Sequence, residues 1–118
     1  MSKITFHSTT ETETIGFLQY LEQYRIEDLL YKSVNSTTEQ TDKQKNFEDL
    51  QKQIERVETK LNSNTETYIC LKDLNISMGQ YRDNMIKDKE LSERIKKCIQ
   101  ALKDIISKFP KDYDVEAR

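Results

Sequence analysis

The sequence predicts an all-α protein, a three- or four-helix antiparallel bundle with coiled-coil-type seams and an elongated shape. Apolar residues recur at helical intervals along most of the chain. Turn-forming residues are scarce, since Gly16, Gly79 and Pro110 are the whole complement of glycine and proline. Hydrophobic residues make up 35% and charged residues 34% of the 118 residues, which suits one small helical domain with a large solvated surface. We expect residues 1–9 to be an N-terminal extension and residues 111–118 a loose tail.

The first predicted helix spans about residues 11–33 and carries apolar residues on two sides. Thr10 and Glu13 have the spacing of a capping box, which marks the helix start. A helix that is apolar on two faces is buried on both, or buried on one and docked to a partner through the other. One arc holds Ile15, Leu18, Ile26, Leu29 and Leu30. The opposite arc is aromatic and is the candidate partner-binding face; it holds Phe17, Tyr20, Leu21, Tyr24 and Tyr31.

The second predicted helix, about 39–62, shows the clearest periodicity. It follows a polar loop at 35–38, in which Ser36 and Glu39 repeat the capping spacing. Its apolar residues are spaced 3-4-3-4 and fall within about 80° of one another on a helix, which is typical of a coiled-coil contact. They are Phe47, Leu50, Ile54, Val57 and Leu61.

The third predicted helix, about 66–86, is less regular. Three apolar residues, Ile69, Cys70 and Ile76, fall off the face on which its other apolar residues recur. Residues 67–71 would also serve as a short strand, although we expect a helix. The polar breaks at 62–65 and 86–88 are either turns between antiparallel helices or kinks in one longer helix.

The fourth predicted helix, about 88–109, has a strong apolar stripe and is ended by Pro110. Its seam residues are Leu91, Ile95, Cys98, Leu102, Ile105 and Phe109. Lysines and arginines flank this stripe, where their aliphatic stems can cover its edges.

The residue inventory argues against an enzyme and against a bound cofactor or metal. His7 is the one histidine, and His7, Cys70 and Cys98 share no metal-ligand spacing. The scarce glycines cannot build a phosphate-binding loop or a nucleophile elbow. We therefore predict no catalytic residues, and a packed core thiol at Cys98 with a more exposed thiol at Cys70.

The charge pattern and hydropathy favour proteins as partners, and a weak phosphate or membrane binder through the fourth predicted helix is a third possibility. Residues 1–42 are net acidic and residues 87–112 net basic, an asymmetry that is too mild for nucleic-acid binding. No apolar run approaches the ~20 residues of a membrane span, and no secretion signal opens the chain. We expect an intracellular protein, cytoplasmic or nuclear and not secreted, with no small-molecule substrate.

The leading hypothesis is a non-enzymatic protein–protein interaction subunit. A stripe of about 80° buries little area within one chain, so the heptad seams are expected to associate with a second copy or with another helical subunit. The alternative is a small monomeric helical inhibitor or adaptor, of the viral or mobile-element type. It would bind and block an enzyme or host factor through the aromatic face of the first helix.

Overall fold

The computed structural model describes residues 8–110 and is all-helical over that range. Four α-helices follow one another, with two short 3-10 segments between the first and the second, and no strand occurs in the described part of the chain. The α-helices are α1 (Thr9–Leu21), α2 (Thr37–Glu58), α3 (Glu66–Arg82) and α4 (Asp88–Ser107), and the 3-10 segments are η1 (Ile26–Leu29) and η2 (Tyr31–Ser33). The all-α prediction is thereby confirmed, and residues 67–71 are helical.

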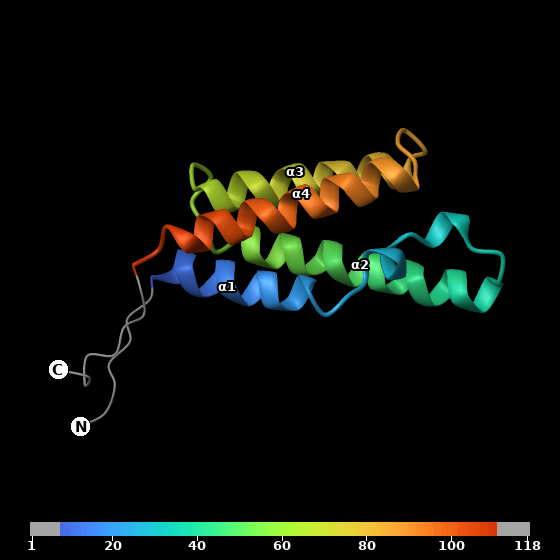
Figure 1. Cartoon of the computed structure of the whole chain (residues 1–118), viewed down its shortest axis with the longest axis horizontal. Coiled ribbons are helices and arrows are strands. Elements are labelled where there is room, and N and C mark those ends of the chain that lie inside the picture. Colours follow the sequence, from blue (N-terminus) through green and yellow to red (C-terminus); the bar gives the residue numbers. More distant parts are fainter. Residues whose placement is uncertain (1–7, 111–118) are drawn as a thin grey trace, which may run out of the picture.

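Successive helices run in opposite directions and form a four-helix bundle (Figure 1). Helices α2 and α4 each contact both α1 and α3, so the four helices surround one core. Residues 59–65 and 83–87 are turns rather than kinks. The start of α1 and the end of α4 lie at the same end of the bundle (Figure 1).

The first helix is much shorter than predicted, because α1 ends at Leu21 instead of continuing to residue 33. The missing length is replaced by η1 and η2, both of which pack against α2. Leu29 and Tyr31 belong to opposite arcs of a continuous helix, yet both are buried. The 3-10 turns change the direction of the chain and bring both side chains to the same core.

Three of the four α-helices, α1, α2 and α3, begin at a residue whose side chain caps the helix. The cap of α1 is Ser8 rather than the predicted Thr10: the Glu11 amide donates to Ser8 Oγ (3.1 Å), and the Ser8 amide donates to Glu11 Oε1 (2.7 Å). Residues 8 and 9 therefore belong to the helix start and not to an extension, while residues 1–7 and 111–118, with His7, lie outside the described residues. Ser36 caps α2 through the Glu39 amide (3.3 Å), as its spacing predicts.

The predicted seams of α2 and α4 form the centre of the core. Nine of their eleven residues are at most 7% exposed. The other two are partly buried, because α2 ends before Leu61 and α4 ends before Phe109. These stripes therefore pack inside one chain, and their coiled-coil geometry and the elongated shape stay predictions. The nine are Phe47, Leu50, Ile54, Val57, Leu91, Ile95, Cys98, Leu102 and Ile105.

Candidate protein-binding groove

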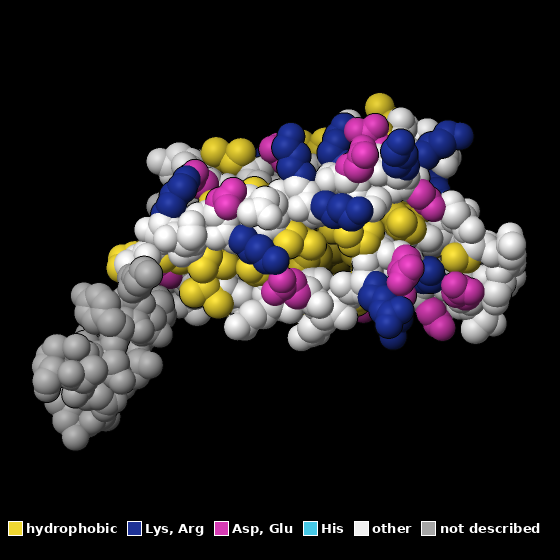
Figure 2. All heavy atoms as spheres, in the orientation of Figure 1, with side chains coloured by type: hydrophobic (Ala, Val, Ile, Leu, Met, Phe, Trp, Pro, Cys, Tyr) yellow, Lys and Arg dark blue, Asp and Glu magenta, His cyan; other side chains and the backbone are white. Residues whose placement is uncertain are grey.

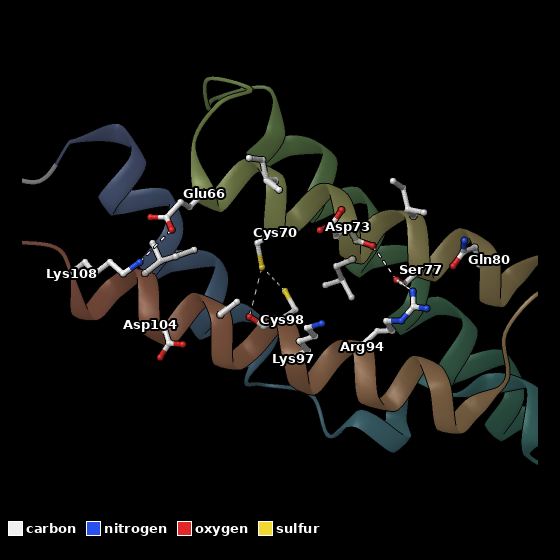
Figure 3. A pocket seen from close by; sticks show the side chains of 15 residues that line it. Glu66, Cys70, Asp73, Ser77, Gln80, Arg94, Lys97, Cys98, Asp104 and Lys108 are labelled. Atoms are coloured by element: carbon white, nitrogen blue, oxygen red, sulfur yellow. Dashed lines mark hydrogen bonds and ion pairs between the residues drawn. The ribbon is translucent and has the colours of Figure 1, made fainter.

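A groove runs along the outer side of the α3–α4 pair and encloses about 750 Å³ (Figure 3). We call it the α3–α4 groove. Ile69 and Ile76 of α3 line it, and each is 51% exposed, although isoleucine is among the residue types most often buried. Its remaining apolar lining comes from Cys70, Leu74, Cys98, Ala101 and Ile105.

Charged side chains from both helices surround this apolar lining. Lys108 Nζ, directly after the end of α4, lies 3.3 Å from Glu66 Oε1 of α3, an ion pair across one end of the groove. Arg94 Nη1 donates to Ser77 Oγ (3.0 Å), a second bond between the two helices. Figure 3 shows both contacts, with Asp73, Lys97 and Asp104 also lining the groove. The mixed signs make the rim polar without selecting a strongly acidic or basic ligand.

The lining also contains a buried acceptor without a partner. Gln80 Oε1 has no hydrogen-bond donor within reach among the described residues, although the atom is buried. A buried acceptor of this kind costs free energy unless a donor reaches it. The Gln80 side chain would have to rotate before an amide or hydroxyl group of a bound molecule could supply that donor.

Two thiols meet in the groove. Cys70 Sγ of α3 and Cys98 Sγ of α4 are 3.3 Å apart and point toward each other (Figure 3). The hydrogen bond shared with Cys98 lowers the pKa of the Cys70 thiol, while the same bond and burial raise the pKa of the Cys98 thiol. The structure thus agrees with a core position for Cys98 and a half-buried one for Cys70.

The predicted aromatic face of the first helix does not form. Phe17 and Leu21 are 1% exposed and Tyr31 is 6% exposed, so these three side chains are part of the core and not of a surface for a partner. Tyr20 and Tyr24 are partly buried and contact each other edge to face, with their hydroxyl oxygens 2.9 Å apart. The prediction depended on a helix continuing to residue 33, and α1 ends too early to align the five residues.

Figure 2 shows one face of the molecule, in the orientation of Figure 1, on which α1 and α4 meet. Hydrophobic side chains reach the surface along the line between these helices, and lysines, arginines and carboxylates are interspersed over the remainder. Within residues 8–110 no group of three or more histidine, cysteine, aspartate or glutamate side chains is arranged to hold a metal ion. No helix of that range is long and apolar enough for a membrane crossing.

Comparison with known proteins returns no relative. No protein-family model matches the chain, and no curated protein or solved structure does so either.

The sequence contained a signal for the groove that the seam analysis did not use. Ile69, Cys70 and Ile76 are the residues that fall off the main apolar face of the third helix, and all three line the groove. Apolar residues outside the core-facing stripe indicate a second contact surface.

Proposed function

We propose that the protein is a non-enzymatic binding protein that folds as a monomer and holds an amphipathic helix of another protein in the α3–α4 groove. The observation that carries the proposal is the pair of half-exposed isoleucines, Ile69 and Ile76, on one wall of that groove. Exposed apolar side chains that are surrounded by polar ones are typical of protein-binding sites.

The spacing of the two isoleucines supports a helical ligand. They are seven residues apart on α3, which corresponds to two turns and about 10.5 Å along the helix axis. A ligand helix with apolar residues at i, i+3/i+4 and i+7 matches that distance. Its flanking polar residues would meet the charged rim, and rotation of the Gln80 side chain would let a donor among them reach Oε1.

Because the seams are buried within one chain, we propose a monomer in place of the predicted association through the heptad stripes. Ile54, Leu91 and Leu102 are 0% exposed within one chain, so no second copy is needed to cover them. A stable dimer of standard size buries about 800 Å² per partner with an apolar centre. Three large hydrophobic residues of the described chain, Ile69, Ile76 and Met85, are more than half exposed, which is fewer than the apolar centre of such an interface needs. The coiled-coil geometry and elongated shape would then be properties of the monomer.

Such a protein would still be an adaptor or inhibitor, but its binding surface would lie on α3 and α4 instead of on the first helix. The test begins with a displayed library of amphipathic helical peptides, selected on the immobilised full chain. Binding of the selected peptides is then mapped by chemical-shift changes in the ¹⁵N-labelled protein. We expect the shifts to concentrate on α3 and α4.

Two variants test the site with the same chemical change. Ile76→Asp removes an apolar group from the groove, and Met85→Asp removes one that is 69% exposed in the α3–α4 turn, outside the groove. Ile76→Asp should weaken peptide binding about tenfold or more, as expected for a central interface residue. Met85→Asp should leave it unchanged. Equal losses of peptide affinity in both variants, or chemical-shift changes confined to α1, would overturn the proposed site. A concentration-dependent dimer in light scattering would overturn the proposed monomer.

A further inference from the structure

The two cysteines of the chain are placed by different helices within reach of each other. Cys70 is on α3 and Cys98 on α4, 28 positions later, and their sulfur atoms are 3.3 Å apart. We propose that Cys70 and Cys98 form a reversible dithiol–disulfide pair, whose oxidised form links α3 to α4 at the α3–α4 groove. This inference does not depend on what the groove binds.

The geometry requires little movement for the bond to form. A disulfide has a sulfur–sulfur distance of about 2.05 Å, so the two sulfur atoms must approach by about 1.3 Å. Both side chains already point toward each other (Figure 3). The helices that carry them are packed together and are held near the pair by Arg94–Ser77 and Lys108–Glu66 contacts. Rotation of the side chains, without separation of the helices, is the expected change.

Exposure assigns different roles to the two thiols. Cys70 is half-buried and lines the groove, whereas Cys98 is 5% exposed. A reagent from solution therefore reaches Cys70 first. The hydrogen bond shared with Cys98 also lowers the pKa of Cys70, which favours the thiolate that attacks, although burial and the nearby Asp73 carboxylate act in the opposite direction. Cys98 is then the resolving thiol.

The oxidant class is a low-molecular-weight disulfide such as oxidised glutathione. The Cys70 thiolate attacks one sulfur of the reagent, the reagent's S–S bond breaks, and one thiolate leaves. Cys98 loses its proton to that thiolate or to water and attacks Cys70 Sγ. The mixed disulfide breaks, and the second reagent thiolate leaves and is protonated. Two protein thiols are oxidised, and one reagent disulfide is reduced to two thiols.

The first experiment uses the full wild-type chain in buffers of graded reduced and oxidised glutathione. Samples are quenched with acid and alkylated, and the intact mass of the protein is measured by mass spectrometry. We expect a monomer that has lost two hydrogen atoms, takes up no alkylating reagent and returns to the dithiol on reduction. A persistent glutathione adduct, two free thiols across the whole series, or chains linked to each other would overturn the proposal.

Two single variants test the assigned roles. In Cys98→Ala, glutathione should remain attached to Cys70, because no resolving thiol is present. In Cys70→Ala, Cys98 should react with the disulfide about tenfold or more slowly than Cys70 does in the first variant. Similar rates in the two variants would contradict the roles. Circular dichroism checks that both variants are folded, and if either is not, the wild-type redox series decides the proposal by itself.

Discussion

At the scale of single residues, Tyr81 connects three segments of the chain. Its ring packs against Tyr31 and Phe47, with centroid distances of 5.5 and 5.8 Å. Its hydroxyl donates to Asp88 Oδ1 (2.7 Å) and accepts from the Lys32 backbone N–H (3.0 Å). This buried side chain of α3 thus contacts η2, α2 and the start of α4.

Replacement of this hydroxyl should measurably weaken the fold. Tyr81→Phe keeps the ring and removes a hydrogen bond to a carboxylate, and it leaves the Lys32 amide without its acceptor. The free energy of unfolding should fall by about 2 kcal/mol, as expected for a hydrogen bond to a charged group. Urea denaturation measures the change. Tyr20→Phe, which removes a half-buried hydroxyl paired with another tyrosine, is the control and should lower the free energy of unfolding by less. An equal decrease in the two variants would contradict the role of Tyr81.

Ionisation of the Tyr81 hydroxyl is expected to lower the stability of the protein in alkaline solution. Burial, together with the hydrogen bond to Asp88, raises the pKa of Tyr81 above its ordinary value of 10.0, and burial also raises the pKa of Tyr31. Above pH 10 the unfolded chain releases these protons while the folded chain retains them. The free energy of unfolding therefore decreases as the pH rises from about 10. The contribution of these groups is fully present below that pH.

Denaturation midpoints between pH 8 and 11 measure this dependence. We expect the decrease to be shallower in Tyr81→Phe than in the wild-type protein, since one raised pKa has been removed. Identical slopes in the two proteins would show that Tyr81 does not contribute to the alkaline loss.

At the scale of elements, the α3–α4 turn is fixed by one residue with unusual backbone geometry. Asn84 has φ of 64°, in the left-handed region that asparagine and glycine adopt most readily. Its side-chain oxygen accepts from Lys32 Nζ, which also donates to the Arg82 carbonyl (2.8 Å). The turn is therefore held both by its own conformation and by η2.

Two substitutions at this position separate the two effects. Asn84→Ala should lower the free energy of unfolding by about 1 kcal/mol, because alanine tolerates positive φ poorly and the contact with Lys32 is lost. Asn84→Gly loses the same contact but keeps the backbone freedom, so it should be the milder change. Thermal denaturation of both variants makes the comparison. Equal losses in the two variants would show that the shared loss of the Lys32 contact, and not the positive φ of residue 84, limits the turn.

The elements also show where sequence reasoning succeeds and where it fails. Seam residues such as Ile54 and Leu102 repeat at a constant helical period, and α2 and α4 bury them as the period predicts. The region after Leu21 was not predictable in the same way. Leu29 and Tyr31 both enter the core only because the chain leaves the helix, and no proline or glycine marks that change. Tertiary packing against α2, which a local pattern does not contain, determines the end of α1.

At the scale of the whole molecule, the stability depends on one continuous core. Leu102→Ala should lower the free energy of unfolding by about 2–5 kcal/mol, since the side chain is 0% exposed and a cavity would remain. Leu102→Asp should unfold the protein, because a carboxylate there has no partner. Circular dichroism with urea titration measures both. Lys103→Ala, at the neighbouring exposed position, is the control and should change the free energy of unfolding little. Retained stability in Leu102→Asp would contradict the assignment of Leu102 to the core.

The candidate groove could be predicted in part at this scale. The sequence identifies Ile69, Cys70 and Ile76 as residues outside the apolar stripe, but it does not say which helix lies beside them. The antiparallel turn at 83–87 places α4 there and brings Cys98 opposite Cys70. A pair of residues 28 positions apart meets only after the topology is known.

The bundle brings the beginning of α1 and the end of α4 to the same side of the molecule (Figure 1). Residues 8 and 110 could therefore be joined by a short linker, and new ends could be opened in the polar turn at 62–64, which is exposed. Circular permutation is tolerated where backbone of this kind is cut. The order of the helices along the chain would change, while every pair of neighbouring helices would keep its contacts. The same closeness would let residues 8–110 be inserted as a unit into a surface loop of a host protein, with the α3–α4 groove left open to solvent.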